Sequence, residues 1–123
     1  MSDEPNQFNP AAIERLIRLG GGKFAVEMMD LFSSYGGKKL AEARQARQSG
    51  NLTALADAAH PLKSSAGNVG AARVQELAAQ VESAAREQKA DLAGAQLDEL
   101  ERAFAEARTF LETEKSKLVK PPS

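Results

Sequence analysis

Residues 51–70 read NLTALADAAHPLKSSAGNVG and hold the most regular apolar pattern of the chain. Asn51 is suited to cap a helix that begins behind it, and Gly70 is suited to end one. Between them, apolar side chains recur at steps of three and four residues, which is the spacing of one face of an α-helix. We therefore predict a helix whose apolar face packs into a core. That face consists of Leu52, Leu55, Ala59, Leu62, Ala66 and Val69.

The segments on either side of this stretch also show helical spacing. Asn9 followed by Pro10 is typical of a helix start, and the glycines at 20–22 are typical of a helix end. A kink or short break is expected at Gly36–Gly37, because each glycine costs a helix about 1 kcal/mol relative to alanine. The predicted helices cover approximately residues 9–19, 23–49, 51–70, 72–88 and 91–118.

The composition favours an all-α fold. Strong helix formers dominate the 123 residues, aromatic residues make up only 5%, and no segment alternates apolar and polar residues as a strand would. Four longer helices with short links predict an antiparallel four-helix bundle with a short additional N-terminal helix. We expect one domain at residues 9–118, with flexible tails at 1–8 and 119–123.

Charge and residue counts exclude several classes of protein. The chain has no cysteine and one histidine, so a metal site built from thiolates or several imidazoles is excluded. Sixteen basic residues stand against seventeen acidic ones, which does not favour nucleic-acid binding. No apolar run is long enough to span a membrane, and the polar N-terminus does not resemble a signal peptide. We therefore expect a cytoplasmic protein.

The single histidine, His60, is predicted to face solvent. At 100° per residue it points about 130° away from the centre of the apolar face of its helix. Lys63, Ser64 and Gly67 share its face, because they follow it by three, four and seven residues. Small neighbours leave room for a partner to approach the ring, and the ammonium group of Lys63 would offset the charge of a phosphoryl group. This arrangement suits a phosphate carrier.

The segment from His60 to Ala71, HPLKSSAGNVGA, resembles the signature of the histidine phosphotransfer (HPt) domain family. The resemblance implies a phosphocarrier and not an autonomous enzyme: Nε2 of His60 takes a phosphoryl group from a receiver-domain aspartyl phosphate, or from a kinase, and passes it on. It also implies that Lys63 assists electrostatically and that Mg²⁺ is bound by the receiver, so that the chain has no cofactor of its own. The implied partners are response-regulator receiver domains and a (hybrid) histidine kinase, and the implied state is a monomer. Ser64, Gly67 and Gly70 are the expected surroundings of the phosphorylated ring.

Members of that family often hold Nδ1 of the histidine with a polar side chain 22 positions later, which is Glu82 in this chain; Gln80 is a nearby alternative. A carboxylate that accepts from the Nδ1 N–H would leave Nε2 free to attack. Two departures from the family pattern stand out. Pro61 directly follows the histidine and is expected to kink the helix, and Ser64 stands where the family often has glycine.

A receiver domain must cover His60 with an apolar surface. Four side chains, those of Met28, Met29, Phe32 and Tyr35, are more apolar than one core face requires, and methionine suits adaptable surfaces. We expect some of these residues to form an exposed patch beside His60, although inward packing of all of them is the alternative. The predicted partner-binding residues are Ile13, Ile17, Met28, Phe32, Pro61 and Asn68.

Three other interpretations fit parts of the sequence. A helical adaptor that binds receiver or kinase domains without carrying a phosphoryl group is the main alternative. A hydrolase with a triad of Asp57, His60 and Ser64 is disfavoured, because a continuous helix supplies neither a strained nucleophile turn nor an oxyanion hole. The third interpretation keeps the phosphoryl chemistry but makes the bundle one domain of a larger kinase; a free-standing protein is preferred.

Overall fold

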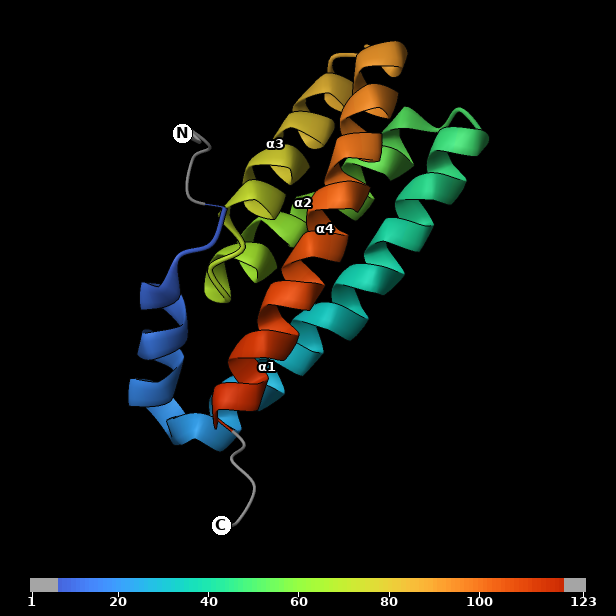
Figure 1. Ribbon diagram of the computed structural model, residues 1–123. Coiled ribbons are helices and arrows are strands. Elements are labelled where there is room, and N and C mark those ends of the chain that lie inside the picture. The colour runs from blue at the N-terminus through green and yellow to red at the C-terminus, as the bar shows by residue number, and fades with distance from the viewer. Residues whose placement is uncertain (1–6, 119–123) are drawn as a thin grey trace.

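The computed structural model describes residues 7–118, and all regular secondary structure in this range is helical. Figure 1 shows the four helices side by side along one bundle. Links of three residues, at 49–51, 69–71 and 87–89, make consecutive helices antiparallel. α1 packs on α2, α2 on α3, α3 on α4, and α4 on α1, which closes the ring. The predicted antiparallel four-helix bundle is confirmed. The helices are α1 (Pro10–Gln48), α2 (Leu52–Asn68), α3 (Ala72–Arg86) and α4 (Ala90–Leu118).

α1 contains the predicted short N-terminal helix. Gly21 inside it has φ 88° and ψ 176°, which are not helical angles. Glycine adopts a positive φ without the steric cost that a Cβ atom would bring. The chain bends there, and Figure 1 shows the first part of α1 (blue) running back along the bundle from this bend. The expected separation of a short helix at about 9–19 from the long helix is therefore confirmed.

The residues just before α1 are attached to the bundle. The Asn9 N–H donates to the Gly70 carbonyl at 2.8 Å, and Phe8 stacks on Phe110 of α4 with ring centroids 4.2 Å apart. The expectation of a loose tail thus fails for Gln7 and Phe8, because an aromatic ring gains by packing on another. The remaining expected tail residues, 1–6 and 119–123, lie outside the described residues.

The predicted kink or break at Gly36–Gly37 is wrong, because α1 is helical through both residues. Gly36 is buried, and a Cβ atom added there would lie 2.5 Å from Cε1 of Phe104. Phe104 packs in the core against Phe32, with 5.2 Å between the ring centroids. Glycine therefore lets α1 and α4 approach closely at this point, and tertiary packing outweighs its low helix propensity.

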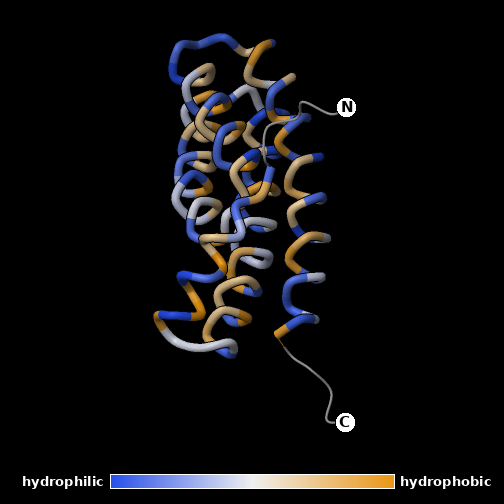
Figure 2. The backbone as a smooth tube through the Cα atoms, turned by 60° about the vertical axis from the view of Figure 1, so that its left-hand side comes forward, coloured by the Kyte–Doolittle hydropathy of each residue, from blue (hydrophilic) through white to orange (hydrophobic). Residues whose placement is uncertain are grey.

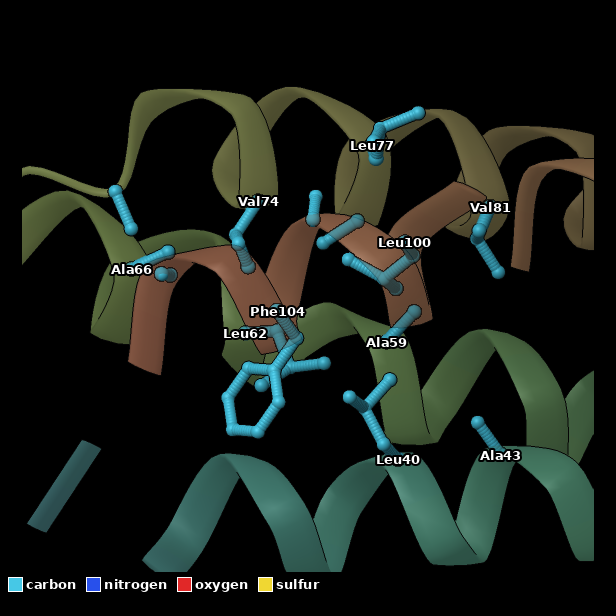
Figure 3. Close-up of a cluster of buried hydrophobic side chains, with 14 of the residues drawn as sticks. Leu40, Ala43, Ala59, Leu62, Ala66, Val74, Leu77, Val81, Leu100 and Phe104 are labelled. Atoms are coloured by element: carbon cyan, nitrogen blue, oxygen red, sulfur yellow. The ribbon is translucent and has the colours of Figure 1, made fainter. Parts of the chain in front are cut away.

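The core lies along the bundle axis and is built from the predicted helix faces. In α2, Leu55, Ala59, Leu62 and Ala66 are buried, and the side chain of Asn51 caps the helix by accepting from the Ala54 N–H. Figure 3 shows Ala59, Leu62 and Ala66 of α2 facing labelled side chains of the other three helices. Figure 2 shows apolar and polar positions alternating along each helix, as expected for helices with one buried face.

Candidate functional site

His60 lies on the outer face of α2, and 61% of its side chain is exposed. Ala59 and Leu62 on either side of it along the helix are buried in the core. The apolar face of α2 thus fixes the rotation of the helix and turns the imidazole toward solvent. The predicted outward orientation of His60 is confirmed.

Glu82 of α3 holds the inner nitrogen of the ring. The distance from His60 Nδ1 to Glu82 Oε2 is 2.8 Å, which is a short hydrogen bond. Burial tends to raise the pKa of the Glu82 carboxyl, but hydrogen bonds from Lys63 and His60, together with their charges, outweigh burial and hold this pKa below its ordinary value. Glu82 is therefore ionised at neutral pH and can only accept, so Nδ1 carries the proton and Nε2 is left with the lone pair. The alternative, Gln80, instead accepts from Gln96 at 3.2 Å.

Lys63 is paired with the same carboxylate. Its Nζ lies 2.6 Å from Glu82 Oε1, and 35% of its side chain is exposed. The sequence predicted an ammonium group beside the histidine. In the structure the two side chains contact the same carboxylate, that of Glu82. Lys63 thus lies within one helical turn of His60, and its charge is neutralised by the Glu82 carboxylate.

Two further charged residues join this cluster that sequence reasoning did not assign to the site. Arg86 Nη2 lies 3.3 Å from Glu82 Oε2 and 3.2 Å from Asp57 Oδ1. The spacing of four residues between Glu82 and Arg86 could have suggested their pairing. The contact with Asp57 joins two helices and has no signal in the sequence.

The small residues around His60 have different roles. Ser64 is exposed on the same face, as predicted. At Gly67, however, an added Cβ atom would lie 2.8 Å from Nε2 of Gln75, so the space is filled by the Gln75 amide of α3 and is not open to a partner. Gly70 has φ 78° and forms the turn that receives the Asn9 hydrogen bond. Gly67 and Gly70 therefore serve the packing of the chain on itself.

Pro61 does not interrupt α2, which is assigned as one helix from Leu52 to Asn68. Proline removes one backbone donor, so the Asp57 carbonyl lacks its usual partner four residues on. The buried residues that flank His60, Ala59 and Leu62, keep this part of α2 against the core. The kink expected at Pro61 stays a prediction.

The apolar patch near His60 has a different composition from the predicted one. Ile13 and Phe32 are 4% and 3% exposed and belong to the core, as does Met29, so these residues are corrected to structural ones. Their side chains pack inward because α1 is rotated to place them against the other helices. A hollow of about 240 Å³ between α1 and α2 remains, and its exposed apolar side chains are Leu31 and Tyr35. Phe32 forms part of its floor. The hollow is lined by Met28, Leu31, Phe32, Tyr35, Ser65, Asn68 and Val69.

The outcome for the other predicted partner-binding residues is mixed. Met28 and Asn68 line this hollow, and Pro61 lies on the same helix one turn before Ser65. Ile17 is half-buried against the core and does not line the hollow. Leu31, which is 55% exposed, was missed by sequence reasoning, because its spacing matches that of the buried residues around it.

Stability should fall in acid partly because of Glu82. Its pKa is lower in the folded than in the unfolded chain, so its contribution is complete above the ordinary value of 4.5 and is lost as the pH falls through the folded-state value. We expect the difference in unfolding temperature between the wild type and Glu82→Gln to shrink as the pH falls below 4.5. Thermal unfolding followed by circular dichroism measures it; an unchanged difference at pH 3 would contradict the prediction.

Residues 7–118 lack the features of two other classes of site. No group of three or more His, Cys, Asp or Glu residues in 7–118 is arranged to hold a metal ion. No helix in the same range is long and apolar enough to cross a membrane.

Comparisons with known proteins identify the family and the fold of the chain. The family model for the Hpt domain matches residues 27–110. The crystal structure of histidine-containing phosphotransfer protein B (HptB) from Pseudomonas aeruginosa PAO1 has the same fold, with a TM-score of 0.86, at 23% sequence identity over 93% of this chain and 98% of that chain. A comparison with curated protein sequences found no match. Because the family model covers more than half of the chain, the chain belongs to the Hpt domain family and functions in histidine phosphotransfer within a phosphorelay.

Proposed function

We propose that His60 is the phosphorylated residue and that Nε2 is the attacking atom. The hydrogen bond of 2.8 Å from Nδ1 to Glu82, on a ring that is 61% exposed, carries this proposal. It leaves the lone pair on the nitrogen that a partner can reach.

The transfer step follows from the protonation of the ring. Nε2 attacks the phosphorus of a receiver aspartyl phosphate, the N–P bond forms, and the P–O bond to the aspartate breaks, which regenerates the receiver carboxylate. The proton stays on Nδ1, so the ring gains a positive charge that the Glu82 carboxylate stabilises. Transfer to a second receiver is the reverse of this step. The chain acts as a phosphocarrier, and Mg²⁺ is supplied by the receiver.

Lys63 is the cation proposed to assist transfer. A phosphoryl group on Nε2 adds up to about two negative charges. Lysine has a flexible stem with three rotatable donors, so its ammonium group can exchange Glu82 for a phosphoryl oxygen. The distance of 2.6 Å between Lys63 Nζ and Glu82 Oε1 supports this role, because it keeps the ammonium group close to the carboxylate that holds the ring.

The proposed partners are response-regulator receiver domains and a (hybrid) histidine kinase, with no nucleic acid and no metal bound by this chain. A monomer in the cytoplasm is part of the proposal. The near balance of 16 basic and 17 acidic residues supports the expectation that nucleic acid is not a partner.

Incubation with a phosphorylated receiver and Mg²⁺ tests the function. Radiolabel should move from the receiver to this chain, and it should be labile in acid and stable in base, as expected for a phosphorylated histidine. Binding of a receiver without any transfer of label, across all receivers of the source organism, would favour the adaptor.

Leu31→Ala should weaken receiver binding while leaving stability almost unchanged. The side chain is 55% exposed beside the hollow between α1 and α2, so it contributes little to the core. A receiver that covers this surface would bury it, and losing a buried leucine contact costs about 1–3 kcal/mol, or roughly tenfold or more in affinity. Titration calorimetry gives the affinity. Leu92→Ala, at an exposed leucine of α4, is the matched control and should bind normally; equal affinities of the two variants would count against this docking surface.

A further inference from the structure

The cluster around His60 contains one more cation than the transfer step uses. Glu82 is 13% exposed and receives Lys63 on Oε1 and both His60 and Arg86 on Oε2. Lys63 and Arg86 therefore flank the carboxylate from its two oxygens. The two cations differ in what else they contact, and this difference suggests separate roles.

Arg86 is anchored to the helix that carries His60. Its Nη2 bridges Glu82 Oε2 of α3 and Asp57 Oδ1 of α2, at 3.3 and 3.2 Å. Asp57 lies three residues before His60, so this bridge spans the two helices on the N-terminal side of the ring. One nitrogen makes both contacts, and because the guanidinium group is always charged, it suits a permanent bridge between two carboxylates.

Lys63 has no second partner of this kind among the contacts of the described residues. If it moves to a phosphoryl group on Nε2, Glu82 loses the ion pair on Oε1. At that moment the carboxylate must still accept from Nδ1, because the ring is then positively charged. Arg86 is the cation that stays.

We propose that Arg86 is a positioning residue that keeps Glu82 on Nδ1 of His60 while Lys63 moves to the phosphoryl group. This inference rests on the proposed function of His60. Arg86 touches neither the ring nor the expected position of the phosphoryl group, so it acts through Glu82. Before transfer, either Lys63 or Arg86 alone is enough to hold Glu82 on Nδ1, and the ring stays in the Nδ1–H form. After transfer, only Arg86 still holds Glu82 there.

The tautomer of the ring tests the proposal directly. The chain has one histidine, so long-range ¹H–¹⁵N spectra show a single set of ring signals that need no assignment. At pH 8.5, where an ordinary imidazole with a pKa of about 6.5 is neutral, the wild type, Lys63→Ala and Arg86→Ala should all show the Nδ1–H form. The double variant Lys63→Ala/Arg86→Ala should show a mixture of the two tautomers. A double variant that keeps the Nδ1–H form, or a Lys63→Ala variant that already loses it, would overturn the proposal.

Transfer kinetics supply the second measurement. Arg86→Ala should lower the rate constant for phosphoryl acceptance inside the receiver complex about tenfold, within the ~10²-fold that a misplacement of 1 Å can cost. The dissociation constant of that complex should change less than twofold, and Arg86→Lys should recover most of the rate. Arg73→Ala is the matched control, because Arg73 also lies on α3 and pairs with a carboxylate of its own helix, Glu76, at 2.9 Å.

The outcomes separate this inference from the proposed function. If the wild type accepts no label from any receiver, the function itself fails. If the wild type accepts label and Arg86→Ala accepts it as fast as Arg73→Ala, only the role of Arg86 is wrong. Arg86 is 47% exposed, so both variants should fold, and circular dichroism verifies this.

Discussion

Replacing His60 by glutamine should reduce phosphoryl acceptance by more than about 10³-fold, because the residue that forms the covalent bond is lost. Glutamine cannot act as a nucleophile toward phosphorus, and no second histidine exists in the chain to replace it. The measurement is transfer of radiolabel from a phosphorylated receiver, followed with time.

The same replacement should hardly change stability. The side chain of His60 is 61% exposed and its ring is not part of the core. Substitutions at such positions usually change the free energy of unfolding by less than about 0.5 kcal/mol. Receiver affinity should also be close to that of the wild type. Label that persists in His60→Gln would show that another residue is phosphorylated, and a large loss of stability would show that the histidine has a structural role.

Replacing Gly36 by valine should destabilise the bundle by about 3 kcal/mol, the upper part of the usual range for added volume in a packed core. Even the first atom of the new side chain would lie 2.5 Å from Cε1 and 2.9 Å from Cζ of Phe104. Phe104 is 4% exposed and packs against Phe32, so the ring has little room to move away. Figure 3 shows it beside Leu62 among the core side chains. Urea unfolding gives the free energy.

The adjacent glycine provides a matched control. A Cβ atom at Gly37 would meet only Arg108 Nη2, at 3.2 Å, which is the end of a flexible side chain. Gly37→Val should therefore change the free energy of unfolding by less than about 1 kcal/mol, because the Arg108 side chain can move away and valine has a higher helix propensity than glycine. A second variant, Gly36→Val with Phe104→Leu, should recover part of the loss, because the two sites are in contact. Equal effects at Gly36 and Gly37 would contradict the close approach of α1 and α4.

Sequence reasoning was most accurate where one helix suffices to decide the result. The outward orientation of His60 follows from the apolar residues of α2 alone, and the bend at Gly21 follows from three consecutive glycines. The Glu82 contact came from the family resemblance and not from geometry, although the structure places the two residues 2.8 Å apart.

It was least accurate where the surface of a second helix decides the result. Gly36 was expected to break a helix, but it lies against Phe104 of α4. Gly67 was expected to leave room for a partner, but Gln75 of α3 fills that space. Phe32 was expected on the docking surface, and it is buried, whereas Leu31 one position earlier is exposed.

By itself, then, the sequence determined the helical class of the chain, the buried face of α2 and the exposure of its single imidazole. These properties depend on periodicity and helix propensity, which act over a few neighbouring residues. Only the tertiary structure decided which cations share Glu82, which glycines serve close packing, and which apolar side chains of α1 remain exposed. Those properties depend on how each helix is rotated and spaced against partners far away in the chain, and a rotation of one residue, about 100°, is enough to exchange a core side chain for a surface one.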